Sequence, residues 1–566
     1  MFEYSLLTTA GAALATYHAP LRRLLRIGPV LLLSVAVATP LRAAPSITLV
    51  ANAAGNIGFN APLAQGVIFI LKGSGLGPAQ ISTASSPFQS TNLSGTSVAV
   101  TVGTTTVNAL MYYTSDAQVA ALLPSNTPTG VGNFTVTYNG QTSNAVTHGI
   151  VANNLGLFTV DSSGQGPAIV TYPDGSLVSA AKADSCGGPY TVCGAANTGD
   201  TLILWGTGLG PVNGADQSGA GLGQNMPNVP LTVWLGGVQA PISYQGRSGC
   251  CIGEDEIFIT VPNNAATGCA VPLVVQVGTG ANTVSNTTLI PVANGSRDCT
   301  PVNAAFNSVG AANIVQLASS NSVRFAQIDL EKDPNGTGYQ DNAQFDFAKV
   351  TGVAPGTAPF FPSYIDSQPL NTCVVYPSLN NVDTRTPITS LAGLDAGSTF
   401  ILAGPNGSVT LPANNGNFST ISGAGNFLAA GSFTFTGTGG ADIGPISAAL
   451  TVPALPALTI PSTLPSITRS NGMTVSWTGG GGNVQLTISS ATDSSNTVGS
   501  TAVCTAPAGA GRFTIPPYVL LALPAGNFAF SGFSSAEAYY PFTATGLDVG
   551  WVQTQISGPG FGIALQ

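Results

Sequence analysis

The sequence predicts an all-β protein in which tandem immunoglobulin-like β-sandwich domains follow an N-terminal signal peptide. Only 7% of the 566 residues are charged, whereas Gly (70) and Pro (40) are abundant, and this composition suits strands joined by tight turns. Segments such as FTVTYNG (134–140) alternate polar and apolar residues and end in turn residues, as antiparallel strands do. A unit of about 100 residues also occurs twice, which is the usual length of one such sandwich.

Residues 1–43 have the features of an export signal. The basic cluster LRRLLR (21–26) precedes the 14-residue apolar run IGPVLLLSVAVATP (27–40), and small residues suited to cleavage follow near Ala43. The run is shorter than the ~20 residues that a membrane-spanning helix needs, so an uncleaved anchor is the less favoured alternative. We therefore expect a secreted or cell-surface protein, or a periplasmic one, without a membrane span in the mature chain.

The charge of the chain argues against a nucleic-acid partner. Its net charge is −9, and removal of residues 1–43 would take away four Arg and one Glu and leave −12. Phosphate backbones are bound by clustered Lys and Arg, and the mature sequence contains no such cluster.

An internal repeat defines the first half of the chain. QGVIFILKGSGLGPA (65–79) aligns with TGDTLILWGTGLGPV (198–212). Three further matches follow in the same order, namely VTVG (100–103) with VWLG (233–236), QVAALLPSNTPTG (118–130) with EIFITVPNNAATG (256–268), and SNAV (143–146) with SNTT (285–288). They predict two copies of one unit, residues 46–152 and 153–299, of which the second carries the insertion GRSGCCIGEDE (246–256).

The repeat also decides an ambiguous segment. DAQVAALLP (116–124) alone favours a helix because Ala and Leu are helix formers. Its counterpart DEIFITVP (255–262) is rich in β-branched and aromatic residues and predicts a strand. Because equivalent positions of a repeat share structure, we predict a strand at both.

The ordered elements GSGLGP, VTVG, LLPSNTPTG and SNAV resemble those of the IPT/TIG-like domains of large bacterial exported proteins. More closely, the TGLGP, CC and IFITVP elements of the second copy are similar to those of an uncharacterised family of tandem repeats. The resemblance covers residues 46–299. It implies an Ig-like fold and an exported protein, and it implies no particular reaction.

The second half also has the pattern of β-structure. LAAGSFTFTG (428–437) is repeated as LPAGNFAFSG (523–532), which predicts two further sandwich-like regions at 390–455 and 456–566. Residues 300–389 are less regular and are expected to form an irregular β region.

Two shorter segments of the second half also predict a particular local structure. The proline-rich TVPALPALTIPSTLPS (451–466) favours an extended connector. GMTVSWTGGGGNVQLTISS (472–490) predicts a hairpin with the glycine run at its turn.

All eight cysteines follow the leader, and an even number in an exported protein favours disulfides. Cys186 and Cys193 are expected to close a small loop, and Cys373 and Cys504 remain for each other by elimination. The other four cysteines form a second group in which the two adjacent ones are expected to choose different partners: Cys250, Cys251, Cys269 and Cys299. A metal centre is not favoured, because there is no C-x-x-C pair and the mature chain has a single histidine.

Candidate catalytic groups are few, so we predict a protein that is not an enzyme. The G-T-G-L-G string at 206–210 lacks a following helix and a Lys-Ser/Thr pair, and it predicts a turn rather than a nucleotide site. His148, in NAVTHGIV, is expected to be a polar residue at a domain junction. The carboxylates of EDE (254–256) are expected to lie on a solvated loop.

The best candidate for a bound ion is EKDPNGTGYQDN (331–342). Glu331, Asp333, Asn335 and Thr337 alternate as in a calcium loop, with Gly336 at the sixth position. A plain β-turn at DPNG is the default interpretation, and apart from this weak calcium site no cofactor is expected.

Three of the four tryptophans, Trp205, Trp234 and Trp477, follow strand-like residues and are expected in cores, whereas Trp551 is the least constrained. The leading hypothesis is a non-enzymatic exported protein with a structural, adhesion or scaffold role and a protein or glycan ligand at the cell surface. The alternative is a carbohydrate-binding protein or a non-catalytic module of polysaccharide utilisation. A glycoside hydrolase within 300–566 is the third hypothesis.

Overall fold

The computed structural model describes most of the chain after the predicted signal peptide, and residues 1–42 of that segment lie outside the described residues. The described ranges are 43–55, 61–86, 88–182, 190–219, 221–278, 283–335, 338–354, 356–379, 388–412, 419–421, 425–459, 466–492, 498–535 and 538–566. In these ranges no helix is both long and apolar enough to cross a membrane.

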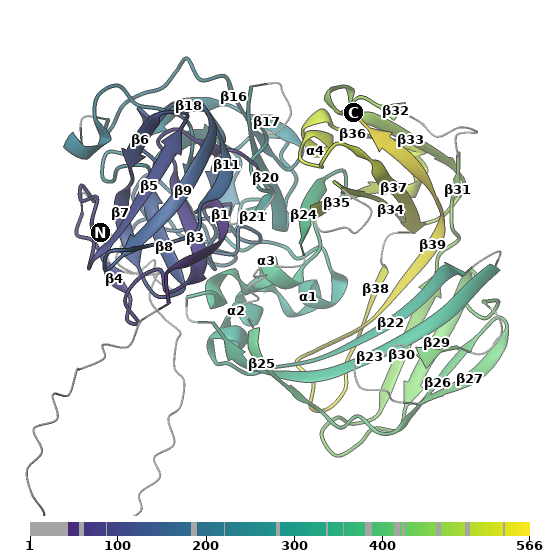
Figure 1. Ribbon diagram of the computed structural model, residues 1–566. Coiled ribbons are helices and arrows are strands. Elements are labelled where there is room, and N and C mark those ends of the chain that lie inside the picture. The colour runs from purple at the N-terminus through teal and green to yellow at the C-terminus, as the bar shows by residue number, and fades with distance from the viewer. Residues whose placement is uncertain are drawn as a thin grey trace, which may run out of the picture. The chain divides into compact units, whose positions relative to one another are not determined.

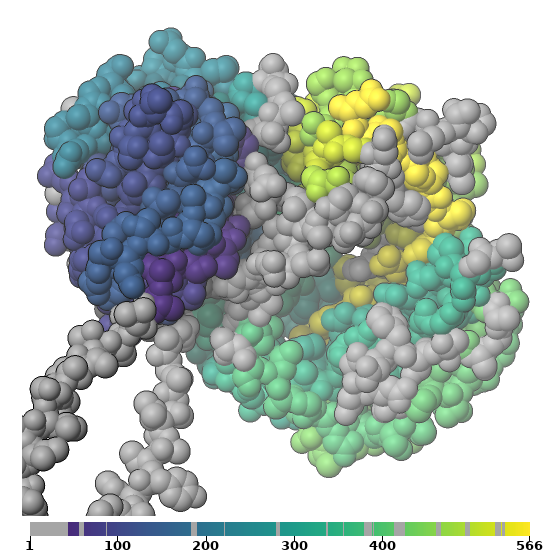
Figure 2. All heavy atoms as spheres, viewed as in Figure 1, coloured from purple at the N-terminus to yellow at the C-terminus, as the bar shows by residue number. Residues whose placement is uncertain are grey.

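The first repeat is a sandwich of two β-sheets (Figure 1). One sheet has the order β1-β3-β8-β7-β4, and the other has the order β2-β11-β9-β5-β6 with β10 beside β9. The strands are β1 (Ser46–Asn52), β2 (Leu63–Ala64), β3 (Ile68–Ser74), β4 (Ser82–Thr83), β5 (Thr96–Val102), β6 (Thr105–Asn108), β7 (Leu110–Thr114), β8 (Gln118–Leu122), β9 (Gly130–Tyr138), β10 (Gln141–Thr142) and β11 (Val146–Val151). Phe69 of β3 meets Phe134 of β9 between the sheets, with ring centroids 5.5 Å apart. The atoms of this repeat, purple to blue, pack into one continuous body in Figure 2.

The second repeat has the same topology. Its sheets have the orders β12-β15-β19-β18, with β13 beside β15, and β14-β21-β20-β16-β17. The elements are β12 (Gly156–Leu157), β13 (Val170–Thr171), β14 (Ala196–Asn197), β15 (Thr201–Thr207), η1 (Asp216–Ser218), β16 (Leu231–Leu235), β17 (Val238–Ala240), β18 (Ile242–Arg247), β19 (Asp255–Thr260), β20 (Gly268–Val277) and β21 (Thr288–Ala293). The short parallel pair β2–β11 of the first repeat recurs as β14–β21. The strands predicted at 116–124 and 255–262 are confirmed as β8 and β19.

Residues 300–566 add three further sheets. An 11-stranded sheet of described residues has the main order β24-β35-β34-β37-β39-β22-β23-β25, and a 4-stranded sheet (β27-β26-β29-β30) and a 3-stranded sheet (β31-β33-β36) accompany it. The strands up to the middle of this region are β22 (Val323–Asn335), β23 (Gly338–Val353), β24 (Cys373–Leu379), β25 (Ile388–Gly393), β26 (Thr399–Gly404), β27 (Gly407–Pro412), β28 (Ser419–Thr420), β29 (Gly431–Gly437) and β30 (Ile446–Val452). The later strands are β31 (Ala457–Leu458), β32 (Ser466–Ile467), β33 (Met473–Thr478), β34 (Asn483–Ala491), β35 (Val498–Pro507), β36 (Arg512–Ile515), β37 (Gly526–Ser535), β38 (Ala538–Phe542) and β39 (Val549–Leu565).

Strand β39 joins the two halves of the large sheet. Its first part runs parallel to β22, and its last part runs antiparallel to β37. The long hairpin of β22 and β23 is visible beside it in Figure 1. The hairpin side shares a core with the 4-stranded sheet, where Phe345 and Phe400 stack with centroids 4.9 Å apart. The β34–β35 side shares a core with the 3-stranded sheet around Trp477.

Residues 300–566 also contain short helices. They are α1 (Ala304–Val309), α2 (Ala311–Ser319), η2 (Ala358–Phe360), α3 (Phe361–Ile365), η3 (Arg469–Asn471), η4 (Ala508–Ala510) and α4 (Pro517–Leu521). Helix α1 begins where the side chain of Asn303 accepts a hydrogen bond from the N–H of Ala305, as an N-cap residue does. Phe306 of α1 packs edge-on against Trp551 of β39. Residues 300–389, expected to be irregular, thus hold helices and the strands β22, β23 and β24.

The prediction of a hairpin at 472–490 is wrong. β33 pairs with β36 and β31, whereas β34 pairs with β35 and β37, so the glycine run joins two different sheets. Gly479, Gly480 and Gly482 have φ values of 67°, 85° and 67°, a backbone region that glycine occupies without steric penalty. These repeated left-handed residues turn the chain away from the sheet of β33, so β33 and β34 do not pair with each other.

Candidate functional site

The two glycine-rich segments that define the repeat are turns after β3 and β15. Gly208 and Gly210 have φ values of 106° and 142°, which favour glycine. The N–H of Leu209 in this turn donates to Oδ2 of Asp255 at 2.7 Å. The turn therefore holds a carboxylate of its own chain.

Asp255 also forms a buried ion pair with Arg247. Nη1 of Arg247 lies 2.7 Å from Oδ1 of Asp255, and the two side chains are 1% and 0% exposed. Nη2 of Arg247 donates to the carbonyl oxygen of Gly210 at 2.8 Å. The expectation that the EDE segment is a solvated loop is thus wrong for Asp255, because a cation and a backbone N–H replace water around its carboxylate.

Burial changes the protonation of the neighbouring carboxyl groups. It raises the pKa of Asp255 to about 6, although Arg247 and the N–H of Leu209 act in the opposite direction. Burial raises the pKa of Glu254 to about 7, and the negative charges of Glu256 and Asp255 add to this effect. At neutral pH Asp255 is therefore ionised and paired with Arg247, whereas Glu254 titrates near neutrality.

A second carboxylate ties the two repeats together. Asp216, in η1 of the second repeat, accepts hydrogen bonds from the N–H and Oγ of Ser125 at 2.7 and 3.0 Å. Ser125 follows β8 of the first repeat, and its Oγ accepts from the N–H of Val212 at 3.1 Å. Asp216 and Ser125 are 6% exposed each, so the contact is shielded from water.

The insertion of the second repeat packs against the first. Ile252 lies in an apolar cluster with Ile68 and Leu122 on the outer face of a sheet of the first repeat. Its carbonyl oxygen accepts a hydrogen bond from the Tyr112 hydroxyl. Thr207 Oγ1 accepts from the N–H of Ile68 at 2.8 Å and donates to the carbonyl of Gly253 at 2.6 Å. We call this set of contacts, together with Asp216–Ser125, the repeat junction.

The disulfides differ in part from expectation. Cys250 and Cys251 are bonded to each other rather than to different partners, because Cys269 and Cys299 face each other in the core and form their own bond. Cys373 of β24 is joined to Cys504 of β35, the pair reached by elimination. Cys193 is disulfide-bonded, and its expected partner Cys186 lies outside the described residues.

His148 lies on β11 within the first repeat and is 8% exposed. Its Nε2 lies 2.9 Å from the carbonyl oxygen of Ala61, and its ring meets Phe134 edge-on. Burial lowers the pKa of His148, so the ring is neutral at pH 7. A neutral ring held between a carbonyl and a phenyl group has a structural role.

The calcium candidates lie along a paired strand. Glu331, Asp333 and Asn335 belong to β22, opposite Asn342, Gln340 and Gly338 of β23. Alternate residues of a strand are roughly 6–7 Å apart, whereas a calcium loop wraps its oxygens around one point. These three residues therefore do not form the expected loop, and Thr337 lies outside the described residues.

The tryptophans also differ in part from expectation. Trp551, expected to be the least constrained, is buried between Phe306 and Phe325. Trp477 is in a core as expected and donates to the carbonyl of Ala508 at 2.7 Å. Trp205 and Trp234 are only half-buried, and Trp234 stacks on Tyr518 with centroids 4.6 Å apart.

Two hollows open on the surface of residues 300–566. The larger, about 540 Å³, lies between the end of β30, the glycine run and β38, and we call it the Tyr540 groove. The Tyr540 hydroxyl donates to the carbonyl of Thr451, and glycine, alanine and proline line much of the rest. The groove lining is Ala430, Gly431, Thr451, Val452, Pro453, Ala454, Gly481, Gly482, Asn483, Ala538 and Tyr540. No charged side chain is among these lining residues.

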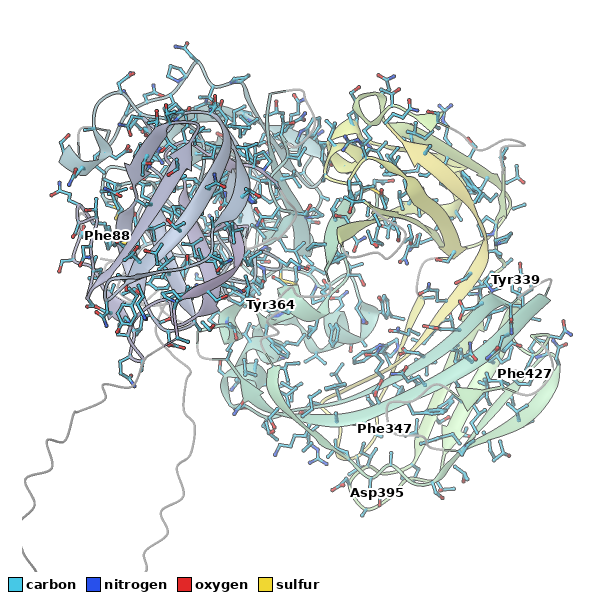
Figure 3. All side chains as sticks on the ribbon, in the orientation of Figure 1. Phe88, Tyr339, Phe347, Tyr364, Asp395 and Phe427 are labelled. Atoms are coloured by element: carbon cyan, nitrogen blue, oxygen red, sulfur yellow. A yellow bond between two sulfur atoms is a disulfide. The ribbon has the colours of Figure 1, made fainter. Side chains whose placement is uncertain are left out.

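The smaller hollow, about 420 Å³, is lined by Phe347, Asp395 and Asp442 among others. Figure 3 labels two of these residues, Phe347 and Asp395. The Asp395 carboxylate accepts from the N–H groups of Gly397 and Ala441, and the Asp442 carboxylate accepts from the N–H of Asp395. These backbone hydrogen bonds lower the pKa of Asp395, so both carboxylates serve to shape the loop.

No protein-family model and no curated protein matches this chain. Among solved structures it is similar to SGBP-B from a complex xyloglucan utilization locus in Bacteroides uniformis, at 11% identity over 67% of this chain and 86% of that one, with a TM-score of 0.16. It is also similar to domains 5–6 of the S-layer protein SbsC, at 12% identity over 44% and 100% of the chains, with a TM-score of 0.16. The FN1–FN3 domains of chicken CNTN1 match at 7% identity over 72% and 99%, with a TM-score of 0.13. At these TM-scores the likenesses carry no argument about function.

Proposed function

We propose that this chain is a non-enzymatic, exported protein that acts as a scaffold or adhesion component at the cell surface or outside the cell. The observation that supports this proposal is the repeat junction. Domains in tandem usually move relative to one another unless a large apolar interface restrains them. Here an apolar cluster, the hydrogen bond from Ile68 to Thr207 and the Asp216–Ser125 hydrogen bonds hold the two repeats together.

A rigid pair of sandwiches suits a protein that spaces its partners or bears load. The polar groups of the junction serve this purpose, because Asp216 and Ser125 bind each other across it and the N–H of Val212 donates to Ser125 Oγ. If the repeats moved apart, the buried Asp216 carboxylate would lose both hydrogen bonds from Ser125.

The rigidity is tested by spin labels at exposed positions of each repeat, Val131 and Leu177. We expect a narrow distance distribution in the wild type, and a clearly broader one in Asp216→Ala, which removes the acceptor of both hydrogen bonds from Ser125. A broad wild-type distribution would contradict the scaffold role. Export is tested separately by cell fractionation and protease treatment of intact cells, and a cytoplasmic, protected chain would contradict it.

The second candidate function is binding of a neutral glycan in the Tyr540 groove. An aromatic ring beside small residues lets a pyranose ring approach closely, and the amide of Asn483 offers a donor and an acceptor. The lining has no charged side chain and the chain is acidic, which disfavours anionic sugars.

A glycan array and retention on insoluble polysaccharides test this candidate. Tyr540→Ala should abolish binding, Tyr540→Phe should retain most of it, and Tyr376→Ala, at another exposed tyrosine, should not change it. If the wild type binds no neutral glycan, or if Tyr540→Ala binds equally well, the groove is not a glycan site.

A further inference from the structure

The insertion of the second repeat brings two sulfur atoms and a carboxylate together. The Sγ atoms of Cys250 and Cys251 and a carboxylate oxygen of Glu254 all lie within 4.8 Å of one another. Cys250 is exposed, whereas Cys251 and Glu254 are half-buried. Thiolates and carboxylates are the ligands of zinc and similar cations.

The spacing of two of these atoms already suits a metal ion. Glu254 Oε2 lies 3.7 Å from Cys250 Sγ. A tetrahedral zinc with bonds of about 2.3 Å to sulfur and about 2.0 Å to oxygen would hold those two atoms about 3.5 Å apart. Cys250 and Glu254 therefore need to move little to share one ion, whereas the two sulfurs must first separate from each other.

In the structure the two sulfurs are bonded to each other and cannot act as thiolate ligands. We propose that the Cys250–Cys251 disulfide masks a site for a thiophilic divalent cation such as zinc, and that reduction by a dithiol opens this site. A thiolate of the reductant attacks one sulfur and forms a mixed disulfide, and its second thiolate then releases the protein. Two electrons and two protons pass to Cys250 and Cys251, and the reductant leaves as its own disulfide.

The open site has three protein ligands. Zinc displaces the two thiol protons and binds both thiolates and Glu254, with water in the fourth position, as zinc does where three side chains hold it. Ser248 supports the arrangement, since its Oγ accepts from the N–H of Cys250 at 3.2 Å and lies 3.1 Å from Cys250 Sγ. A hydroxyl that donates to a ligating sulfur is an outer-shell contact of the kind that orients metal ligands.

Solvent exposure should let a reductant reach Cys250–Cys251 before the other disulfides of the described residues. Cys269, Cys299, Cys373 and Cys504 are all buried in cores, so a reductant reaches their bonds only after local opening. Cys250 is open to solvent. Mild treatment with a dithiol is therefore expected to reduce Cys250–Cys251 before the core disulfides.

The site is tested on the full chain by mild dithiol reduction, removal of the dithiol without air, and titration with Zn²⁺ or with Co²⁺ as a coloured substitute. We expect one ion per chain, with the absorption bands of thiolate-bound tetrahedral cobalt, and no uptake by the oxidised protein. The double variant Cys250→Ser/Cys251→Ser keeps every other cysteine and should take up none. Glu254→Gln should weaken binding roughly tenfold or more.

Two outcomes would overturn the proposal. One is a reduced wild type with two additional free thiols that takes up no cobalt. The other is equal uptake by the double serine variant, which would place the metal at other cysteines. Circular dichroism of each variant checks that its β-structure is intact. The metal titration does not depend on glycan binding or on the spacing of the two repeats.

Discussion

Arg247 and Asp255 meet at 2.7 Å in a site that excludes water from both side chains. Removal of one member of such a pair leaves the other charge buried without a partner, which typically costs about 3–5 kcal/mol. We therefore expect Arg247→Met to lower the free energy of unfolding of the repeat pair by this amount, as measured by urea denaturation.

Two control variants test the origin of that loss. The double variant Arg247→Met/Asp255→Asn removes both charges and should recover part of the stability. Arg297→Met breaks a pair with Asp200 whose side chains are 25% and 19% exposed, and it should cost less than Arg247→Met because water partly screens this pair. If Arg247→Met and Arg297→Met lower the free energy of unfolding equally, burial does not determine how much an ion pair contributes to stability.

The folded state should lose stability as the pH rises through the titration of Glu254 in the insertion. The pKa of Glu254 is raised to about 7 by burial, so the folded chain holds a proton that the unfolded chain releases near its ordinary value of 4.5. Between these values the folded state binds more protons, and its stability falls as pH increases. Asp255, with a pKa of about 6, acts in the same direction at lower pH.

We therefore expect the melting temperature of the wild type to decline between about pH 5 and pH 7 from this group. Glu254→Gln, which stays neutral, should show a flatter profile over that range. A wild-type melting temperature that rises through it, or a Glu254→Gln profile with the same slope, would contradict this assignment.

The glycines of the repeat motif should matter for backbone geometry and not for a ligand. Gly208 has a φ of 106°, and a Cβ atom there would collide with the carbonyl oxygen of Asn154. Gly199 has a φ of 85° and open space around it. Gly199→Ala should thus lose only the roughly 1–2 kcal/mol of a left-handed residue, and Gly208→Ala clearly more, in urea denaturation. A melting-temperature increase with added ATP would contradict the turn interpretation.

Much of the first half of the fold could be predicted from the sequence. Each segment of the repeat occurs twice, so the clear strand pattern of DEIFITVP predicted that the ambiguous DAQVAALLP is also a strand. The sulfur pairing of Cys250 could not be found in this way, because the insertion has no counterpart in the first repeat. The burial of Arg247 also leaves no periodic signal, since its guanidinium lies beside Gly66 of the other repeat and binds the turn at Gly210.

The second half was harder to predict because its long strand contains turn-forming residues. β39 includes glycines and Pro559 in ISGPGFG (556–562), a composition that usually indicates a loop. In the structure the pairing of β39 with β37 shifts register near this segment, so the proline lies at an irregular point of the ladder, where its missing N–H is tolerated. The glycine run at 479–482 led to the incorrect prediction of a hairpin, because a turn between sheets and a hairpin turn use the same residues.

Calcium should not bind at the β22–β23 hairpin. Asp333 and Asn335 lie along a strand, and Asn335 Nδ2 donates to Gln340 Oε1 at 2.9 Å. Calorimetric titration with calcium at millimolar concentration should give no saturable heat, and the melting temperature should not change. Saturable heat that disappears in Asp333→Asn would show that the hairpin binds the ion in another arrangement.

The disulfides should differ widely in their effect on stability. A cross-link stabilises mainly by restricting the unfolded chain, and the effect grows with the number of residues it encloses. Cys373–Cys504 spans 131 positions, whereas Cys250–Cys251 joins neighbours. Cys373→Ser/Cys504→Ser should therefore lower the free energy of unfolding by about 2–5 kcal/mol, and Cys250→Ser/Cys251→Ser should change it by less than about 1 kcal/mol. Urea denaturation of both variants under oxidising conditions measures the difference. A large loss in the second variant would mean that the adjacent pair, through Ile252 and its contact with Tyr112, determines how strongly the insertion holds the first repeat.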